Sequence, residues 1–145
     1  MKNMPIFSWD AETGTASCIL SDGEKVFTGF AKCHPDDADM CGEKTGCEIA
    51  LRRAKINALR GYRDELKIAA KTLNQLYYSM NQSTRFNKKS YENRMIQRQI
   101  RQINFDLATT KEMIVSEQES LRAYIKSKDV FYTQTRKRRQ KANIN

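Results

Sequence analysis

The chain has 145 residues, of which 39% are hydrophobic and 30% are charged, and its formal net charge is +9 at pH 7. No apolar run approaches the roughly 20 residues that a membrane-spanning helix needs, and residues 1–10 lack the apolar core of a secretory signal. The composition therefore excludes a membrane-spanning protein, and we expect a cytoplasmic protein with a thin core and much solvated surface.

Residues 6–33 have the pattern of a three-stranded antiparallel sheet. Turn residues separate three short segments rich in apolar or β-branched side chains, at residues 6–9, 15–20 and 25–33. The pair Asp22-Gly23 between the last two segments is a strong hairpin signal. Gly29 within the third segment indicates a bulge or the close approach of another backbone.

A short acidic helix is expected to open at His34-Pro35-Asp36-Asp37, because proline and carboxylates both suit a first helical turn. We assign this β-meander and its acidic helix to a first domain, residues 1–47.

From Glu48 onward, apolar residues recur in alternating steps of three and four. This spacing predicts helices with a heptad seam, the row of a and d positions that packs against another helix. The first seam consists of Leu59, Tyr62, Leu66, Ala69, Leu73, Leu76 and Met80. After an interruption at residues 82–90, the second consists of Ile96, Ile100, Ile103, Leu107, Thr110, Ile114, Glu117, Leu121 and Tyr124.

The predicted fold class is α+β, with a small N-terminal three-stranded antiparallel β-sheet followed by a long antiparallel helical hairpin, a coiled coil, at residues 48–128. Each helix would have about 35 residues and a length near 50 Å. The polar seam residues Thr110 and Glu117 set the register, face a partner or mark an imperfect bundle. Two helices bury only one stripe each, so we expect a homodimer through the hairpin or a bound partner. Residues 129–145 form a basic tail.

The charge is divided unevenly along the chain. Residues 1–50 carry nine acidic and four basic side chains, a net charge of −5, whereas residues 51–145 carry 22 basic and eight acidic ones, a net charge of +14. A strongly positive half attracts phosphate backbones or acidic protein surfaces. The charge pattern therefore indicates a binding protein more directly than it indicates a reaction.

Basic side chains on the two helices, at the hairpin tip and in the tail are the candidate nucleic-acid or partner-binding residues. They are Arg52, Arg53, Arg60, Arg63, Lys67, Arg85, Lys88, Lys89, Arg94, Arg98, Arg101, Arg136, Lys137, Arg138 and Arg139. Among them, Arg94, Arg98 and Arg101 step by four and three, so they share one helix face and can follow a row of phosphates.

Aromatic residues near the expected tip could stack on unpaired bases, and they are Tyr77, Tyr78, Phe86 and Tyr91. The alternative for the whole basic region is a solvated coiled-coil flank, with the aromatic side chains packed into the end of the bundle.

The cysteines are expected to be thiols, because the cytosol keeps most disulfides reduced. Together with the single histidine they are a possible zinc set, Cys18, Cys33, His34, Cys41 and Cys47. The spacing lacks the C-x2-C knuckle of ordinary zinc folds, and small core residues explain the cysteines as well. We predict no metal and no cofactor.

The acidic residues after His34 could hold a divalent ion, but carboxylates at a helix N-terminus are the simpler explanation. They are Asp36, Asp37, Asp39 and Glu43. The sequence contains no nucleophile elbow, phosphate-binding loop or dinucleotide fingerprint. We therefore predict no catalytic residues.

Gly29-Phe30-Ala31-Lys32-Cys33-His34-Pro35-Asp36-Asp37 forms a strand that enters an HPDD turn, and Gly46, Ile49-Ala50 and Arg53-Ala54 follow at a helix start. This pattern resembles small uncharacterised proteins of bacteriophages and integrated elements in Gram-positive bacteria, over less than a fifth of the chain. The resemblance brings no catalytic motif. It implies a phage accessory gene, among those that block host defence, such as anti-CRISPR proteins.

We therefore predict a non-enzymatic phage or mobile-element accessory protein in the cytoplasm of a host bacterial cell. Its basic hairpin would engage a host defence nuclease or the guide or target nucleic acid of that nuclease, and it would inhibit by occupying that surface. The alternatives are a structural coiled-coil assembly protein and a metal-dependent nuclease that uses the acidic turn at Asp36 and Asp37.

Overall fold

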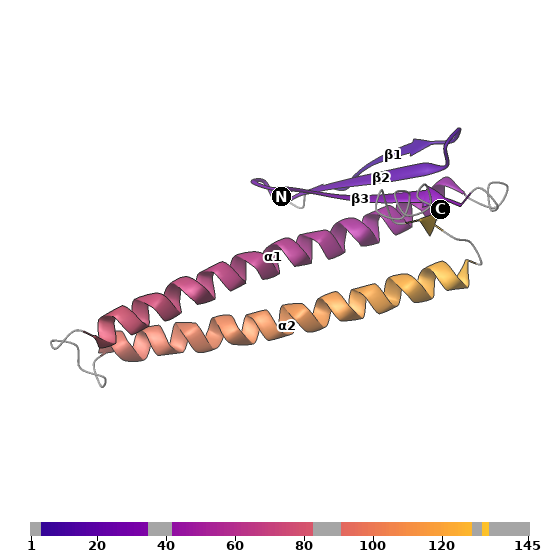
Figure 1. Cartoon of the computed structure of the whole chain (residues 1–145). Coiled ribbons are helices and arrows are strands. Elements are labelled where there is room, and N and C mark those ends of the chain that lie inside the picture. Colours follow the sequence, from indigo (N-terminus) through magenta and orange to yellow (C-terminus); the bar gives the residue numbers. More distant parts are fainter. Residues whose placement is uncertain (1–3, 35–41, 83–90, 129–131, 134–145) are drawn as a thin grey trace, which may run out of the picture. The chain divides into compact units, whose positions relative to one another are not determined.

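The computed structural model describes residues 4–34, 42–82, 91–128 and 132–133 of the chain. They form an α+β arrangement, in which an antiparallel sheet is followed by two long helices packed together, as the sequence predicts (Figure 1). The contacts divide the chain into two compact units, which we describe separately. Unit 1 contains Met1–Ala58 and Val115–Asn145, and unit 2 contains Leu59–Ile114.

The sheet of unit 1 has the strand order β1-β2-β3-β4, and every pairing is antiparallel. The three predicted strands are present, as β1 (Ile6–Asp10), β2 (Thr15–Ser21) and β3 (Val26–Cys33). A short fourth strand, β4 (Tyr132–Thr133), pairs with the end of β3 and was not predicted, because its two residues lie within the segment assigned to a basic tail.

The hairpin between β2 and β3 closes through the predicted Asp-Gly pair. Gly23 has a φ of 100°, a left-handed conformation that glycine adopts without a steric penalty. The Asp22 carboxylate accepts hydrogen bonds from the backbone N–H groups of Lys25 at 2.7 Å and Glu24 at 3.0 Å. These bonds favour the charged carboxylate and hold the pKa of Asp22 below its ordinary value.

The two long helices are α1 (Glu43–Asn81) and α2 (Tyr91–Ser127). Helix α1 begins five residues before the predicted boundary at residue 48. The short acidic helix expected to open at His34-Pro35-Asp36-Asp37 falls mainly on residues 35–41, which are outside the described residues.

The core of unit 1 lies between the sheet and the start of α1, and small side chains let the two backbones come close. Ala16 and Ala31 on the sheet and Ala50 and Ala54 on α1 are fully buried. A Cβ atom on Gly29 would overlap the carbonyl oxygen of Ala50 and the backbone nitrogen of Ala54. The predicted close backbone approach at Gly29 is therefore confirmed.

Two polar side chains of α1 bind the edge of β3. Arg53 Nη1 donates a hydrogen bond to the carbonyl oxygen of Phe30 at 2.7 Å, and Asn57 Nδ2 donates one to the carbonyl oxygen of Thr28 at 2.7 Å. The two residues are one helical turn apart and reach two strand residues that point the same way. They satisfy carbonyl groups that would otherwise be open to pairing with another strand.

Within unit 2, α2 uses the predicted seam. Ile96, Ile100, Ile103 and Leu107 are half-buried, whereas Thr110 and Ile114 are buried. The Thr110 hydroxyl donates a hydrogen bond to the carbonyl oxygen of Asp106 at 2.7 Å, so this polar seam residue is satisfied within its own helix.

The seam of α1 in unit 2 differs from the prediction. Leu66 is buried, but Tyr62 and Leu76 are 48% and 47% exposed. Tyr77, which was assigned to the hairpin tip and not to the seam, is half-buried, and its hydroxyl accepts a hydrogen bond from Gln97 Nε2 at 2.8 Å. The apolar stripe of α1 is therefore wider than the surface that α2 covers.

Candidate nucleic-acid interface

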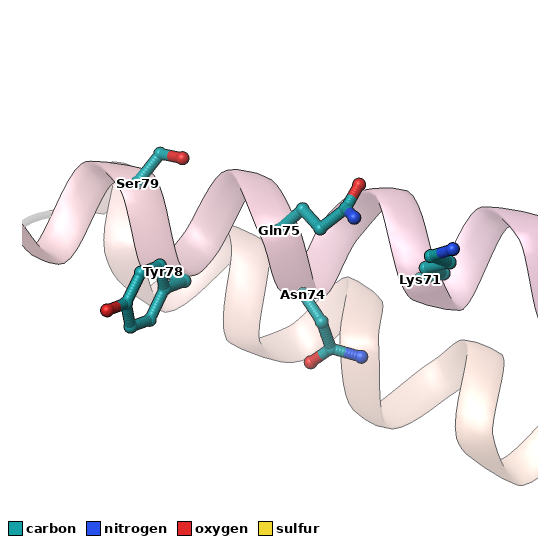
Figure 2. A pocket seen from close by; sticks show the side chains of 5 residues that line it. All are labelled: Lys71, Asn74, Gln75, Tyr78 and Ser79. Carbon is teal, nitrogen blue, oxygen red and sulfur yellow. The ribbon is translucent and has the colours of Figure 1, made fainter.

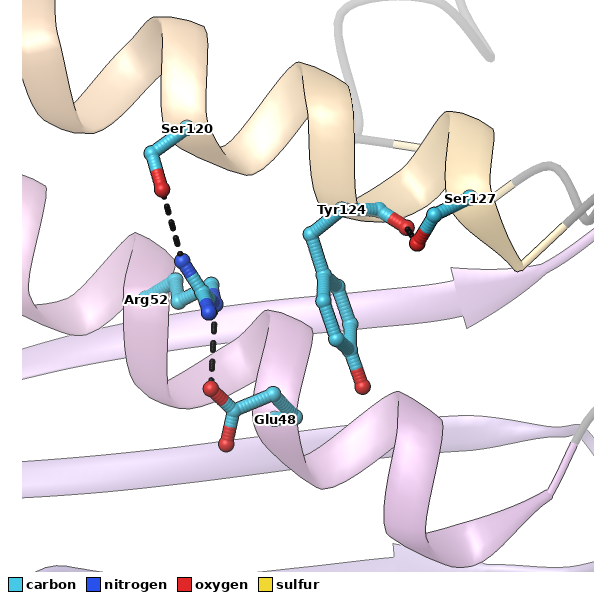
Figure 3. Close-up of polar contacts among 5 residues, drawn as sticks. All are labelled: Glu48, Arg52, Ser120, Tyr124 and Ser127. Carbon is cyan, nitrogen blue, oxygen red and sulfur yellow. Dashed lines mark hydrogen bonds and ion pairs between the residues drawn. The ribbon is translucent and has the colours of Figure 1, made fainter.

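The first predicted cation of α1 is held by interactions within unit 1. Arg52 Nε pairs with Glu48 Oε1 at 3.0 Å, and Arg52 Nη1 donates a hydrogen bond to Ser120 Oγ at 3.0 Å (Figure 3). Its guanidinium also lies 4.8 Å from the ring centroid of Tyr124. These contacts join α1 to the end of α2, so Arg52 is committed to the packing of unit 1.

The second predicted cation, Arg53, is buried. Its side chain binds the carbonyl oxygen of Phe30 and is not displayed to solvent. The sequence prediction that Arg53 contacts a partner through its charge does not fit this position, because a hydrogen-bonded guanidinium inside the fold is unavailable to a phosphate. The spacing of basic residues along the sequence could not show whether an arginine binds the edge of a strand or faces solvent.

Further along α1, four basic side chains of unit 2 lie on one side of the helix, at Arg60, Arg63, Lys67 and Lys71. Arg63 Nε pairs with the neighbouring Asp64 at 3.1 Å, and such a partly exposed ion pair contributes little energy. Lys67 and Lys71 are exposed. This side of α1 therefore presents positive charge to solvent.

The α1 row ends at a shallow hollow that is open to solvent. Its lining residues all come from α1, and they are Lys71, Asn74, Gln75, Tyr78 and Ser79. Figure 2 shows Lys71 at one end of the hollow and Tyr78 with Ser79 at the other. A surface made by one helix cannot enclose a small molecule as an ordinary ligand pocket does.

On α2, the predicted row of arginines is exposed to solvent. Arg94, Arg98 and Arg101, which we call the arginine row, are all exposed. None of the three forms an ion pair with a residue that the structure describes. The row lies opposite the α2 seam, so its side chains point away from the helix-helix contact.

Two aromatic side chains bracket the arginine row. Tyr91 and Phe105 are each 67% exposed, and they continue the spacing of the row by three residues before Arg94 and four after Arg101. We call the five residues Tyr91, Arg94, Arg98, Arg101 and Phe105 the α2 outer face. The sequence reasoning included Tyr91 but missed Phe105, although a large apolar residue outside the seam was the available signal.

A hydrogen bond between Gln97 and Tyr77 connects the two helices of unit 2. Gln97 lies about one turn from both Arg94 and Arg101, and Tyr77 lies about one turn from Asn74. The bond therefore joins α1 and α2 within unit 2.

The net charge of unit 2 is modest. Its described part, residues 59–82 and 91–114, carries eight basic and five acidic side chains, a net charge of +3. Bulk charge of this size is ordinary for a small protein surface. The positions of the arginines, rather than their number, are what distinguish this surface.

The cysteines do not behave as one set. Cys18 and Cys47 are free thiols, whereas Cys33 is disulfide-bonded. The prediction of a thiol is therefore wrong for Cys33, and its sulfur is not available as a zinc ligand.

The free thiols lie in the core of unit 1. Burial raises the pKa of Cys18 above its ordinary value of 9.0, and the nearby Cys47 raises it further. Burial likewise raises the pKa of Cys47, with a smaller contribution from Glu43. Within the described ranges, no group of three metal-ligating side chains comes together. The thiols of Cys18 and Cys47 are therefore protonated at neutral pH.

Several predicted site residues lie outside the described residues. They are Arg85, Lys88, Lys89, Arg136, Lys137, Arg138, Arg139 and Cys41, with the acidic turn residues Asp36, Asp37 and Asp39.

No helix in the described ranges combines the length and the apolar character that crossing a bilayer requires. Comparisons with protein-family models, with curated proteins and with solved structures find no match to this chain. Its function must therefore be inferred from the side chains that its own surface presents.

Proposed function

We propose that this chain is a non-enzymatic binding protein that holds nucleic acid, free or within a nucleoprotein, against the arginine row of α2. The observation that supports this proposal most strongly is the exposure of Arg94, Arg98 and Arg101 on one helix face without an ion pair among the described residues. A surface arginine without an acidic partner keeps its full attraction for a phosphate.

The spacing of the row suits a phosphate backbone. At a rise of about 1.5 Å per residue, Arg94 and Arg98 are separated by about 6 Å along the helix axis and Arg98 and Arg101 by about 4.5 Å. Flexible arginine side chains can follow successive phosphates over such intervals. Binding of this kind releases counterions, so its affinity falls as the salt concentration rises.

The proposal is tested with a variant in which Arg94, Arg98 and Arg101 are all replaced by glutamine. We expect weaker binding of a fluorescent oligonucleotide and a shallower dependence of log K on log salt. Loss of three phosphate contacts reduces the slope by about 2 for a single strand, or by about 3 for duplex DNA. Fluorescence anisotropy at several salt concentrations measures both quantities.

A matched control removes three positive charges elsewhere. Lys55, Arg122 and Lys126 are exposed residues of unit 1, and their replacement by glutamine lowers the net charge by the same amount. If both triple variants lose affinity equally, the binding reflects overall charge and the arginine row is not the site. If the wild-type chain binds no oligonucleotide at low salt, the proposed function is wrong.

A structural assembly protein is the competing function, and the exposure of Tyr62 and Leu76 on α1 favours it. A second copy could cover these side chains through the heptad spacing that they share with the seam. Light scattering with and without oligonucleotide separates the two functions, because an assembly protein forms the same oligomer in both conditions and retains no nucleic acid.

The biological role that we propose for this binding is inhibition of a bacterial defence nuclease by a phage-type accessory protein. The support for this setting is the sequence resemblance at residues 29–54, and its HPDD turn lies mainly outside the described residues. An inhibitor that acts by occupancy needs one protein molecule per nuclease. A titration of guide-directed DNA cleavage should then reach full inhibition near equimolar protein, and the triple arginine variant should fail to inhibit.

A further inference from the structure

The α2 outer face combines two chemistries at regular intervals. Its five residues, Tyr91, Arg94, Arg98, Arg101 and Phe105, follow one another in steps of three, four, three and four. This is the spacing of a continuous stripe along one side of a helix. The order is aromatic, three arginines, aromatic.

Packing against the residues that the structure describes does not explain the position of the two aromatic side chains. Tyr91 and Phe105 are each 67% exposed, whereas the α2 seam on the other side of the helix contains the residues that pack against α1. An isolated exposed aromatic residue is common on protein surfaces, but two that bracket a basic row on the same face form a composite surface.

This composite surface fits unpaired nucleotides better than it fits a duplex. Arginines alone would serve either ligand, because both present phosphates. The exposed rings add a contact that only unpaired bases can accept, since the faces of paired bases are covered by their neighbours in the stack. Tyr91 and Phe105 are separated by about 21 Å along the helix axis, which is long enough for a short single-stranded segment.

We propose that the α2 outer face binds single-stranded nucleic acid in preference to duplex, with the arginine row on the phosphates and the rings of Tyr91 and Phe105 stacked on bases. This inference rests on the proposed function, because it specifies the ligand class for the same face. Stacking tolerates every base, so the preference is for strandedness and not for sequence.

The test compares the full chain with its Phe105→Ala variant on two probes, a labelled single strand of about ten nucleotides and the duplex of the same length. We expect the wild-type chain to bind the single strand more tightly than the duplex. Loss of one stacked base should weaken single-strand binding by about 5-fold to 150-fold. The affinity for duplex and the salt slope should stay unchanged, because the arginines remain.

Two further variants separate stacking from general apolar contact. Phe105→Tyr keeps an aromatic ring and should bind the single strand like the wild-type chain. Ile68→Ala removes an equally exposed apolar side chain, 68% accessible, from α1, and it should leave both affinities unchanged.

The outcomes distinguish this inference from the proposed function. Equal binding of both probes, with no effect of Phe105→Ala, overturns the single-strand preference and leaves phosphate binding by the arginine row in place. Absence of binding to both probes at low salt overturns the two together. A loss in Ile68→Ala as large as that in Phe105→Ala would also contradict a specific stacking role.

Discussion

Gly29 shows how a single residue controls the distance between two elements. The sequence predicted a bulge or a close backbone approach, and the structure selects the second, with the backbone of α1 at Ala50 and Ala54 lying directly against the strand. The contacting helix residues are more than 20 positions away in the sequence. The residues next to Gly29 therefore could not show whether it marks a bulge or a close approach.

We expect Gly29→Ala to lower the free energy of unfolding by about 1–3 kcal/mol, because the new methyl group meets backbone atoms that cannot rotate aside. Gly42→Ala is the matched control, since a Cβ atom there would meet nothing within 4 Å. Urea denaturation followed by circular dichroism measures both changes. A similar loss at the two positions would show that glycine content, and not the close approach, explains the effect.

The Cys18 thiol makes stability depend on pH at the alkaline end. Its pKa is raised by burial first and by Cys47 second, so the unfolded thiol ionises at a lower pH than the folded one. The stability contribution is therefore complete below about pH 9 and declines as the pH rises further, by at most about 1.4 kcal/mol per pH unit for this group.

We expect Cys18→Ala to be less stable than the wild-type chain at neutral pH but to lose less stability between pH 8 and about pH 10. Comparing the two proteins at each pH cancels the titration of lysines and tyrosines that they share. Parallel declines would mean that Cys18 does not contribute to the alkaline loss.

At the scale of elements, the heptad spacing predicted α2 better than α1. Each predicted α2 seam position in unit 2 is buried or half-buried, including Thr110. On α1, the predicted stripe includes Tyr62 and Leu76, which are about half exposed, and Tyr77 takes a position on the seam through its bond to Gln97. The heptad period alone cannot decide which of two adjacent apolar residues is buried. The partner helix covers only part of a wide apolar stripe.

This difference predicts unequal effects of the same substitution at two predicted seam leucines. Leu66→Ala should cost about 2–5 kcal/mol because Leu66 is only 9% exposed, and truncation leaves a cavity. Leu76→Ala should cost less than about 1 kcal/mol, because nearly half of that side chain already contacts solvent. Equal losses, measured by thermal or urea denaturation, would indicate that something covers Leu76 in solution, such as a second copy of the chain.

At the scale of the whole molecule, the strong positive charge of residues 51–145 is not spread over one available surface. Arg52 and Arg53 are bound within unit 1, and the described part of unit 2 has a net charge of only +3. Most of the remaining excess belongs to segments outside the described residues. Within the described residues, the surface that best suits a polyanion is therefore the five-residue α2 outer face and not the whole basic half of the chain.

By itself the sequence determined the order of sheet and helices, the Asp22-Gly23 turn and the common face of Arg94, Arg98 and Arg101. These features depend on residues that are close together in the sequence. The regular geometry of strands and helices determines which of those residues share a face. Only the tertiary structure decided that Arg53 binds the edge of β3, that Arg52 binds Ser120 and that Phe105 stays exposed beside the arginine row. The physical reason is that burial and pairing depend on residues far apart in the chain, which folding alone brings together.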